Sequence, residues 1–546
     1  MTTLFSRRFS ATRRRLLGGV AAATLLSTTC GAVSTLAAMP ADASTIRAVM
    51  HSGLRVLDPI TTTAHITRDH GYMIWDTLLG MDDQFQPQPQ MADWSVSDDG
   101  MVYTFTLREG LEWHDGGQVT AADAVASFRR WADRDGGGQM LLDHVDSVEA
   151  TDERTMTLTL SSPFAYVLEL MAKPSSVPLF VMPERIASKS PDETLTVEDQ
   201  IGSGPFTFVA DEYDPGNRVV YEKFADYVPR EEPASWTAGG KVVDVDRVEW
   251  INMSDAQTAL NALNSGEIDF LESPSVDLLP VLQANPDLTV EKINELGSQT
   301  IGRFNFLYPP FDDPEIRRAA LTAMNQTDVL ASLIGNPEFY TTCDSMYGCQ
   351  TPLATEAGAP ETLATGGGTE AASEMLEAAG YDGTPVVMMQ PTDAPTVSPQ
   401  PVIAAQLLRQ AGFQVDLQPM DWQTLVTRRA SQQPPGEGGW NMFFTNWYIP
   451  EVWNPLVSPM LNGRGADGGW FGWPDDAELE SMREAFAKAE SDEDRKAIAE
   501  RIQAHAFEQV TYIPLGEYSI PAAWNNDLSG ILHSPVPVFW NITKAE

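Results

Sequence analysis

Histidine and serine residues are the side chains in this sequence with the clearest potential for metal or covalent chemistry. The seven histidines form no His-Glu-x-x-His pair of the kind that holds zinc on a helix. His65 and His70 lie five residues apart near an expected loop; they could bind a metal, but an ordinary polar loop is the simpler interpretation. Ser203 stands in a Gly-Ser-Gly turn without the Gly-x-Ser-x-Gly spacing of a nucleophile elbow or an evident histidine partner. We therefore expect no catalytic residue, no metal site and no cofactor.

A second candidate for chemistry is the glycine run at residues 136–138. It could cradle a phosphate, but no Gly-Lys-Ser/Thr follows it, and we interpret the run as a flexible turn. Carboxylates are too numerous to single out an acid–base pair. An enzyme is therefore only a secondary hypothesis.

Aromatic side chains are concentrated between residues 440 and 473, at Trp440, Phe443, Phe444, Trp447, Tyr448, Trp453, Trp470, Phe471 and Trp473. Core packing explains several of them, because Trp440, Met442 and Phe444 alternate as in a buried strand. Trp447 and Tyr448 are expected just after that strand, and ligands of open α/β sheets meet the carboxyl ends of strands. We therefore predict Trp447 and Tyr448 as ligand-binding residues. Trp470 and Phe471, which follow a glycine-rich loop, are further candidates.

Length and charge restrict the class of protein. A chain of 546 residues is too long for one simple core, so two or more domains are expected. Beyond the N-terminus no run of about 20 apolar residues occurs, and no spanning helix is predicted. The net charge of −41 disfavours nucleic acid and anionic lipid as partners, and solubility explains most of it.

The N-terminus has the pattern of an export signal. Thr12-Arg13-Arg14-Arg15-Leu16-Leu17 and an earlier Arg pair precede an apolar run, and the two paired-arginine sites favour a twin-arginine signal over an ordinary secretory one. Ala41-Asp42-Ala43 places cleavage before Ser44, with cleavage after Ala37 or Ala38 as the alternative. Removal of residues 1–43 takes away five Arg and one Asp and leaves a charge of about −45.

Two cysteines remain in the predicted mature chain, Cys343 and Cys349, with five residues between them. In an oxidising compartment this spacing predicts a local disulfide, which would stabilise the fold by roughly 2 kcal/mol. A metal site there is the weaker interpretation, because no histidine lies nearby in the sequence.

A hairpin followed by a helix is predicted between Pro89 and Trp131. The segments 94–96 and 101–107 alternate like strands, and Asp98-Asp99-Gly100 between them is a turn signal. Thr120 and Asp123 have the spacing of a capping box at the start of a helix.

The same stretch resembles the signature of family 5 extracytoplasmic solute-binding proteins, the oligopeptide-, dipeptide- and nickel-binding components of ABC importers. Its matching positions are Pro89, Ala92, Trp94, Tyr103, Phe105, Leu107, Arg108, Gly110, His114, Asp115, Gly116, Thr120, Ala121, Asp123 and Ser127. Further matches are Ile201-Gly-Ser-Gly-Pro-Phe206 and Leu263-Asn-Ser-Gly-Glu-Ile-Asp269.

The resemblance implies an α/β fold of two lobes with a cleft between them and an extra subdomain in the first lobe. It places lobe I at residues 44–300, lobe II at 301–513 and a return to lobe I at 514–546. It also implies a periplasmic protein, expected to be monomeric, that closes over a small solute or peptide and delivers it to an ABC permease without transforming it.

One departure from the family pattern affects the ligand. Peptide-binding members resemble Trp-x-x-Asp-Tyr-x-Asp-Pro at the cleft, whereas this chain has no Asp after Trp447; Glu451 replaces it only with a shifted register. A buried ammonium without a carboxylate is costly. The predicted cleft residues Asn446, Asn305 and Gln423 would suit a neutral, sugar-bearing or apolar solute, and Tyr72 completes the predicted set.

The sequence leaves several alternative functions open. Within the family the alternatives are an oligopeptide binder and a nickel-chelate binder. Outside it they are a secreted hydrolase that uses the same cleft and a chaperone-like holder of unfolded chains. A fixed nucleophile–base pair would favour the hydrolase, and broad weak binding would favour the holder.

Overall fold

The structure is a computed structural model that describes residues 44–190, 193–489 and 491–545. The predicted export signal, residues 1–43, lies outside the described residues. None of the described helices is long and apolar enough to cross a membrane.

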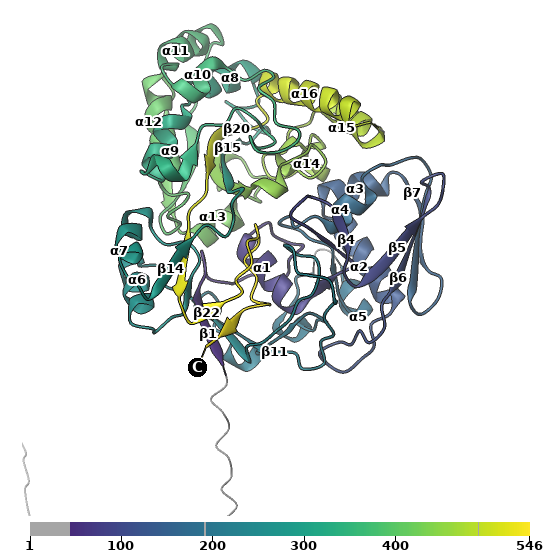
Figure 1. Cartoon of the computed structure of the whole chain (residues 1–546). Coiled ribbons are helices and arrows are strands. Elements are labelled where there is room, and N and C mark those ends of the chain that lie inside the picture. Colours follow the sequence, from purple (N-terminus) through teal and green to yellow (C-terminus); the bar gives the residue numbers. More distant parts are fainter. Residues whose placement is uncertain (1–43, 191–192, 490, 546) are drawn as a thin grey trace, which may run out of the picture. The chain divides into compact units, whose positions relative to one another are not determined.

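A seven-stranded mixed sheet contains both the first strand and a late strand of the chain (Figure 1). Its order is β10 (Phe206–Phe208), β11 (Arg218–Lys223), β12 (Arg247–Ile251), β1 (Thr45–Val49), β13 (Phe270–Leu271), β21 (Ala522–Asn525) and β14 (Leu288–Glu291). β1 pairs in parallel with β12 and β13, and the other pairs are antiparallel. β1 and β12 alternate buried apolar residues with half-buried polar ones, whereas the short β13 is apolar and buried throughout.

A six-stranded mixed sheet forms the second large layer. Its order is β16 (Tyr340–Thr341), β20 (Ile513–Tyr518), β15 (Ser298–Phe304), β19 (Met442–Tyr448), β17 (Val386–Pro391) and β18 (Val415–Met420). β17 pairs in parallel with β18 and β19, whereas β15 is antiparallel to β19 and β20. β15 is buried at every residue and β19 at all but two, so this sheet lies deep in the core.

Two short segments connect the large sheets. The chain leaves β14 at Glu291 and enters β15 at Ser298, and it returns between Tyr518 of β20 and Ala522 of β21. Figure 1 shows the return in yellow, running from β20 toward the sheet that holds β1. The lobe boundaries expected at residues 300 and 513 lie a few residues from these crossings, and we retain the three-part division as a proposal.

The family signature forms a separate antiparallel sheet of four strands. Its order is β5 (Ala92–Val96), β6 (Val102–Leu107), β8 (Thr155–Leu160) and β7 (Val145–Ala150). Helix α2 (Ala121–Ala132) packs against this sheet, and Thr120 and Asp123 form the predicted capping box. This sheet is the extra subdomain that the family resemblance implied.

Short two-stranded ladders and helices complete the described chain. The ladders pair β2 (Asp76–Thr77) with β9 (Phe180–Val181), β3 (Leu79–Met81) with β4 (Pro87–Pro89), and β22 (Leu528–Ser529) with β23 (Thr543–Lys544). The remaining helices are α1 (His65–Ile74), α3 (Gly136–Leu142), α4 (Val167–Ala172), α5 (Glu184–Ala187), α6 (Ala256–Asn264), α7 (Leu279–Gln283), α8 (Pro314–Ala323), α9 (Gln326–Leu333), α10 (Glu361–Thr365), α11 (Thr369–Ala378), α12 (Pro399–Gln410), α13 (Trp422–Arg428), α14 (Gly465–Gly468), α15 (Ala477–Lys488) and α16 (Asp492–Gln509).

One glycine segment differs from the sequence-based interpretation, and another is required by close packing. The run at residues 136–138 is the first turn of α3 rather than a flexible turn, because Asp135 caps that helix by accepting the Gly138 N–H at 2.9 Å. Gly202 is needed for close packing, since a Cβ there would lie 1.6 Å from the carbonyl oxygen of Ile74 at the end of α1.

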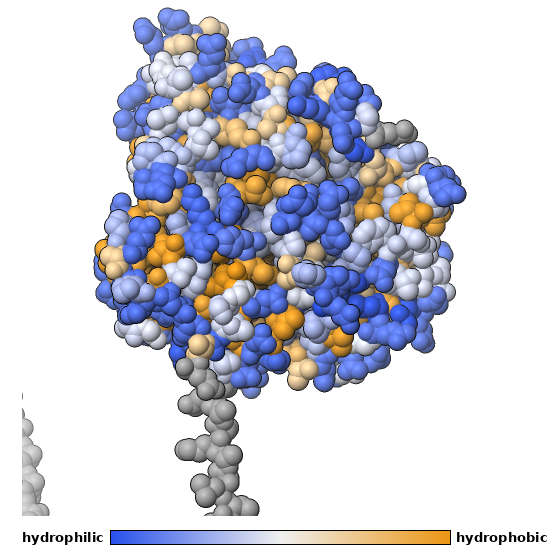
Figure 2. Space-filling model, in the orientation of Figure 1, coloured by the Kyte–Doolittle hydropathy of each residue, from blue (hydrophilic) through white to orange (hydrophobic). Residues whose placement is uncertain are grey.

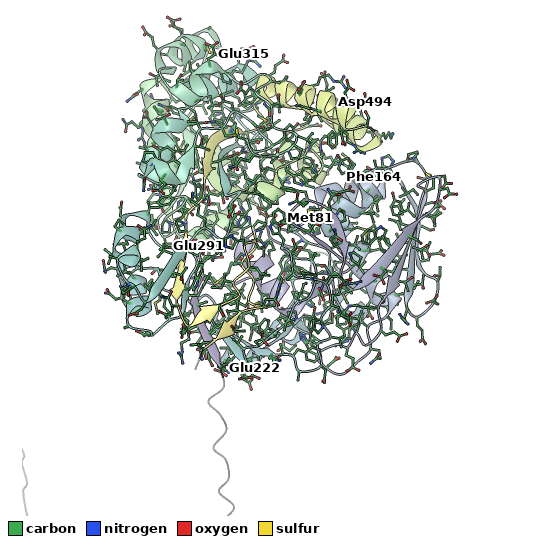
Figure 3. All side chains as sticks on the ribbon, in the orientation of Figure 1. Met81, Phe164, Glu222, Glu291, Glu315 and Asp494 are labelled. Carbon is green, nitrogen blue, oxygen red and sulfur yellow. A yellow bond between two sulfur atoms is a disulfide. The ribbon has the colours of Figure 1, made fainter. Side chains whose placement is uncertain are left out.

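The charged residues lie mainly on the surface. Figure 2 shows hydrophilic residues over most of the visible face, with smaller apolar areas between them. The labelled acids Glu222, Glu291 and Glu315 extend outward in Figure 3, whereas Met81 and Phe164 are buried. This distribution fits the view that the large negative charge serves solubility.

Candidate ligand-binding site

A cavity of about 190 Å³ lies where strands of both large sheets end, and we call it the strand-end cavity. Its wall includes residues that follow β1, β12 and β13 on one side and β17 and β18 on the other, among them His51, Asn252, Ser273, Thr396 and Gln423. All five strands reach the cavity at their carboxyl ends, which is where open α/β sheets bind ligands.

The strand-end cavity is lined by Asn446, Trp447 and Gln423, which the sequence put forward as ligand-binding residues. The Asn446 amide is held in place, because its Nδ2 donates to the Thr396 carbonyl at 3.0 Å and its Oδ1 accepts from Gln400 at 2.8 Å. Trp447 is only 2% exposed, and its indole Nε1 has no hydrogen-bond partner among the described residues. An aromatic wall with a fixed amide and a free N–H can bind both an apolar body and a polar group.

Tyr448 lies at a different place from Trp447. Both belong to the end of β19 and do not follow the strand, so they point to opposite faces of the sheet. Tyr448 lines an adjoining cavity of about 110 Å³, the Tyr448 cavity, and its ring stacks on His65 with centroids 4.5 Å apart.

Glu451 is fully buried and already neutralised by the protein. One carboxylate oxygen lies 2.8 Å from His65 Nε2, and the other accepts from Arg68 at 3.4 Å. Burial alone would raise the pKa of Glu451, but these two neighbours outweigh it and hold the pKa below its usual value. The carboxylate that the sequence offered as a replacement for the missing Asp is therefore already engaged by His65 and Arg68 of the same chain.

A second ionic cluster joins His51, Asp69 and Glu272, whose potential ligand atoms lie within 4.8 Å of one another. His51 Nδ1 is hydrogen-bonded to Glu272 at 2.9 Å, and Arg68 donates to Asp69 at 2.7 Å. These residue types could hold a cation, but in this arrangement all three are already hydrogen-bonded within the protein.

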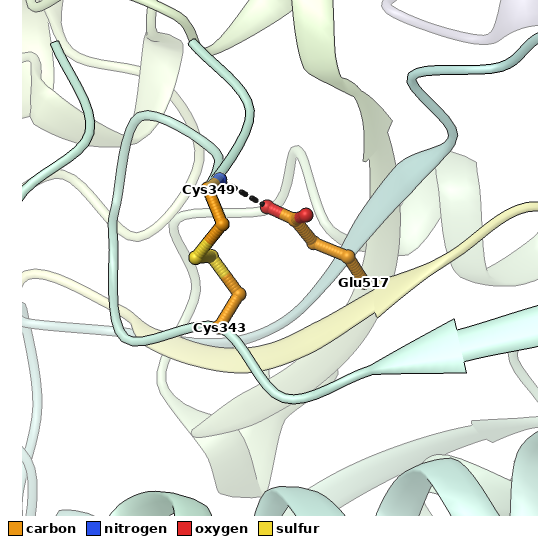
Figure 4. A group of neighbouring side chains, drawn as sticks. All are labelled: Cys343, Cys349 and Glu517. Atoms are coloured by element: carbon orange, nitrogen blue, oxygen red, sulfur yellow. Dashed lines mark hydrogen bonds between the residues drawn. A yellow bond between two sulfur atoms is a disulfide. The ribbon is translucent and has the colours of Figure 1, made fainter. Parts of the chain in front are cut away.

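The cysteine pair forms the predicted disulfide between Cys343 and Cys349 (Figure 4). Glu517 lies beside it and accepts the backbone N–H of Cys349 at 2.9 Å. The sulfur atoms are consumed by the disulfide, so the group is structural rather than metal-ligating.

The other predicted ligand-binding residues are not in the wall of the strand-end cavity. Trp470 and Phe471 line a separate cavity of about 800 Å³, the Trp470 cavity. Tyr72 is in the core against Phe180, and Asn305 donates from its buried amide to the Trp440 carbonyl at 2.9 Å. Neither residue is in the wall of the strand-end, Tyr448 or Trp470 cavity, and their role in ligand binding stays a prediction.

The histidines do not form a catalytic pair with the described serine turn. His114 contacts that turn, yet its ring nitrogens face the Gly202 N–H at 3.2 Å and the Gly204 carbonyl at 3.1 Å, not Ser203. His70 is not in a loop but in α1, bonded to Tyr221 and Gln200, and burial lowers its pKa to about 4. His65 and His70 therefore do not converge on one metal.

Sequence reasoning missed several residues of the cavity wall, namely His51, Thr63, His65 and Arg429. Thr63 and Arg429 are separated by 366 residues, and they meet through a hydrogen bond of 2.9 Å. The sequence around Arg429 offers only an arginine pair, Arg428 and Arg429, at the end of α13. Such a pair does not indicate a binding site until the fold brings Thr63 next to it.

Comparison with known proteins agrees with this architecture. The family model "Bacterial extracellular solute-binding proteins, family 5 Middle" matches residues 86–469. A probable peptide ABC transporter periplasmic-binding protein, y4tO, of Sinorhizobium fredii is 38% identical, over 92% of this chain and 93% of its own. A probable deoxycholate-binding periplasmic protein, YgiS, of Escherichia coli is 27% identical, over 72% of this chain and 75% of its own.

Solved structures share the fold at low sequence identity. The binding protein AgaA of A. tumefaciens R10 with agropinic acid has a TM-score of 0.76 at 20% identity and covers 92% of this chain and 99% of its own. DppA of Helicobacter pylori with the peptide STSA has the same score and identity, with 92% and 98% covered. The fold is thus that of two-lobed periplasmic binding proteins, and the chain belongs to the bacterial extracellular solute-binding proteins, family 5.

Proposed function

We propose that this protein binds a small organic solute in the strand-end cavity and releases it to the permease of an ABC importer. As a member of its family it is a periplasmic-binding protein of such an importer. The observation that carries the proposal is the position of the cavity, with wall residues from the ends of strands in both large sheets.

The ligand is a compact compound with an apolar or sugar-like body and polar substituents. A cavity of about 190 Å³ is smaller than the 300–1,000 Å³ typical of drug-sized ligands. Trp422 and Trp447 supply flat apolar surface, and Asn252, Gln423 and Asn446 supply amides. Relatives bind peptides, agropinic acid and mannopinic acid, and peptide-like or opine-like compounds are the first candidates here.

Binding is coupled to closure of the two lobes. Because the wall is contributed by both sheets, a ligand gains its full set of contacts only when the sheets approach, and the ligand shifts the population toward the closed form. The histidines of the cavity wall, His51 and His65, are hydrogen-bonded to Glu272 and Glu451, and His65 also stacks on Tyr448, so these contacts give no support for chemistry on the ligand. We therefore infer transport without turnover.

The cellular setting follows from the same family membership. We infer export by the signal at residues 1–43, with a twin-arginine pathway favoured, and action as a monomer in the periplasm. A nickel-chelate or oligopeptide ligand is the alternative within the family, and a secreted hydrolase is the alternative outside it.

Ligand screening tests the proposal. Native mass spectrometry of the purified protein, followed by thermal-shift assays with peptides, opines, sugars and nickel chelates, should identify compounds that raise the melting temperature. The Trp447→Ala variant should lose that shift, whereas Trp94→Ala, in the four-stranded sheet, should retain it. Equal shifts in both variants would place the ligand elsewhere, and conversion of a bound compound into a product would contradict transport without turnover.

A further inference from the structure

The strand-end cavity has a basic wall in a strongly acidic protein. The chain has 76 acidic and 35 basic residues, yet the wall contains Arg55 and Arg429, two histidines and a single acid, Asp393. The Asp393 carboxylate already accepts the backbone N–H of Trp422 at 2.6 Å. Among the wall residues Arg55, Arg429 and Asp393 sum to one positive charge, in contrast to the net charge of −41 of the chain, and Glu272 and Glu451 lie behind the two histidines.

Arg429 is the buried cation of this wall. Arg429 is 2% exposed, and no described carboxylate forms an ion pair with it. Nη2 donates to Thr63 Oγ1 at 2.9 Å, whereas Nε is buried without a partner among the described residues. The guanidinium lies over Phe471, 4.9 Å from the ring centre, and over Trp470 at 5.9 Å.

The other buried arginines have more partners within the protein, although Arg303 Nη2 and Arg130 Nε also lack a hydrogen-bond partner among the described residues. Arg68 is paired with Asp69 and Glu451. Arg303 and Arg317 each donate to three backbone carbonyl oxygens. Among these arginines only Arg429 combines a place in the cavity wall with a single described hydrogen bond from its guanidinium.

An unpaired guanidinium in such a place costs free energy that a bound anion would recover. Removing a charge from water is unfavourable unless the charge is paired and hydrogen-bonded. Burial lowers the pKa of Arg429 to about 9, which reflects this uncompensated desolvation. An arginine fork presents parallel N–H groups that match a carboxylate.

We infer that the solute carries a carboxylate, or an oxyanion of similar geometry, that binds Arg429 beside Thr63 in the strand-end cavity. This inference rests on the proposed function and names the ligand class. Thr63 precedes α1, which packs near the seven-stranded sheet, and Arg429 follows α13, beside the six-stranded sheet. An anion at this point contacts both sides of the cavity and favours closure.

The same geometry makes an ammonium group a poor anchor at Glu451, where the chain's own Arg68 and His65 take both oxygens. The protein would then recognise the acidic group of its ligand, whereas peptide-binding members recognise the α-amino group. The sequence predicted a neutral solute from the aromatic residues of the cleft. The inference changes that prediction to a solute with a neutral body and an acidic group.

Matched acids and amides test the inference. Propionate, succinate and hexanoate are compared with their carboxamides by thermal shift and isothermal titration at constant ionic strength, on the wild type, Arg429→Gln, Arg429→Lys and Arg428→Gln. Arg428 is the control, because its guanidinium is bonded to Gln418 and to the Gly438 and Gly439 carbonyls. The acids should bind the wild type and Arg428→Gln at least about tenfold more tightly than Arg429→Gln, with Arg429→Lys between them.

The ligand-free proteins provide a second readout. Arg429→Gln removes an unpaired buried charge, so its melting temperature without ligand should equal or exceed that of the wild type, whereas a merely structural arginine would lower it. Equal binding of acids and amides, or unchanged acid binding by Arg429→Gln, would overturn the inference. If a neutral solute from the screen binds in a Trp447-dependent and Arg429-independent manner, the proposed function stands and the inference fails. If no compound of either set shows Trp447-dependent binding, the proposed function itself fails.

Discussion

Buried ionisable side chains define the properties of this protein at the scale of single residues. Glu451, Arg68 and Asp69 compensate one another, whereas Arg429 and Glu517 have no oppositely charged partner in an ion pair among the described residues. Glu517 is 3% exposed, and burial raises its pKa to about 7 from an ordinary value of 4.5, despite the N–H donated by Cys349. Such a group makes stability depend on pH.

Replacement of Glu517 by Gln should stabilise the protein at high pH. The unfolded chain ionises this acid near pH 4.5 and the folded protein near pH 7, so the free energy of unfolding of the wild type falls as pH rises between these values. Glu517→Gln should therefore be more stable above pH 7, by on the order of 2 kcal/mol, and similar to the wild type below pH 4.5. Urea unfolding at pH 4, 6 and 8 checks this; an equal difference at all three would contradict the assignment.

Local capping holds the elements of the signature together. One Asp123 oxygen accepts the backbone N–H and the hydroxyl of Thr120 at 2.7 and 2.8 Å, and the other accepts the Glu184 N–H at 2.6 Å. The same side chain thus starts α2 and attaches α5 to it. Short-range pairs of this type explain why a signature can be read from spacing alone.

Loss of the Asp123 side chain should weaken the four-stranded subdomain. Asp123→Ala removes the cap and leaves the Glu184 N–H without its acceptor, and we expect a loss of about 2 kcal/mol. Denaturant unfolding measures the loss, with the exposed Asp98→Ala as the control. A loss no greater than that of the control would show that the capping box is not needed for stability.

The disulfide constrains a short loop beside β20. Joint replacement of Cys343 and Cys349 by Ser should lower the free energy of unfolding by roughly 2 kcal/mol, because the open loop gains freedom mainly in the unfolded chain. A reductant should destabilise the wild type by a similar amount and leave the double variant unchanged. Equal sensitivity of both proteins to the reductant would contradict this.

The features predictable from sequence were those formed by neighbours along the chain. The hairpin, the capping box of Thr120 and Asp123 and the disulfide involve partners within a few residues of one another. The cavity wall depends on distant pairs, since Glu451 meets Arg68 across 383 residues. Trp447 and Tyr448 were predicted to follow a strand and to share one site; because they belong to the strand, its alternation sends them to different cavities.

Ionic contacts between the large sheets act at the scale of the whole molecule. Glu451 follows β19 of the six-stranded sheet, and its partners His65 and Arg68 belong to α1, which packs near the seven-stranded sheet. In the part of the chain that the structure describes, only the segments 292–297 and 519–521 connect the sheets through the backbone. The buried carboxylate is therefore one noncovalent link across this connection, and the hydrogen bond from Arg429 to Thr63 is another.

Neutralising Glu451 should loosen that link. Glu451→Gln leaves Arg68 with Asp69 alone and should destabilise the protein by about 3 kcal/mol, as expected for a broken buried pair. The ligand-free variant should also show a larger radius of gyration by X-ray scattering, because the open form is favoured. The exposed Glu374→Gln serves as the control, and identical scattering of the two variants would assign Glu451 a local role only.

The place of β21 in the seven-stranded sheet has a consequence for biosynthesis. Residues Ala522–Asn525 insert between β13 and β14, strands made some 230 residues earlier in translation. Until residues 522–525 leave the ribosome, β13 and β14 each have an unpaired edge that can associate with other chains. High contact order of this kind slows folding. The nascent chain should therefore expose more unpaired strand backbone, and bind a holding chaperone more readily, than the complete chain after β21 has paired.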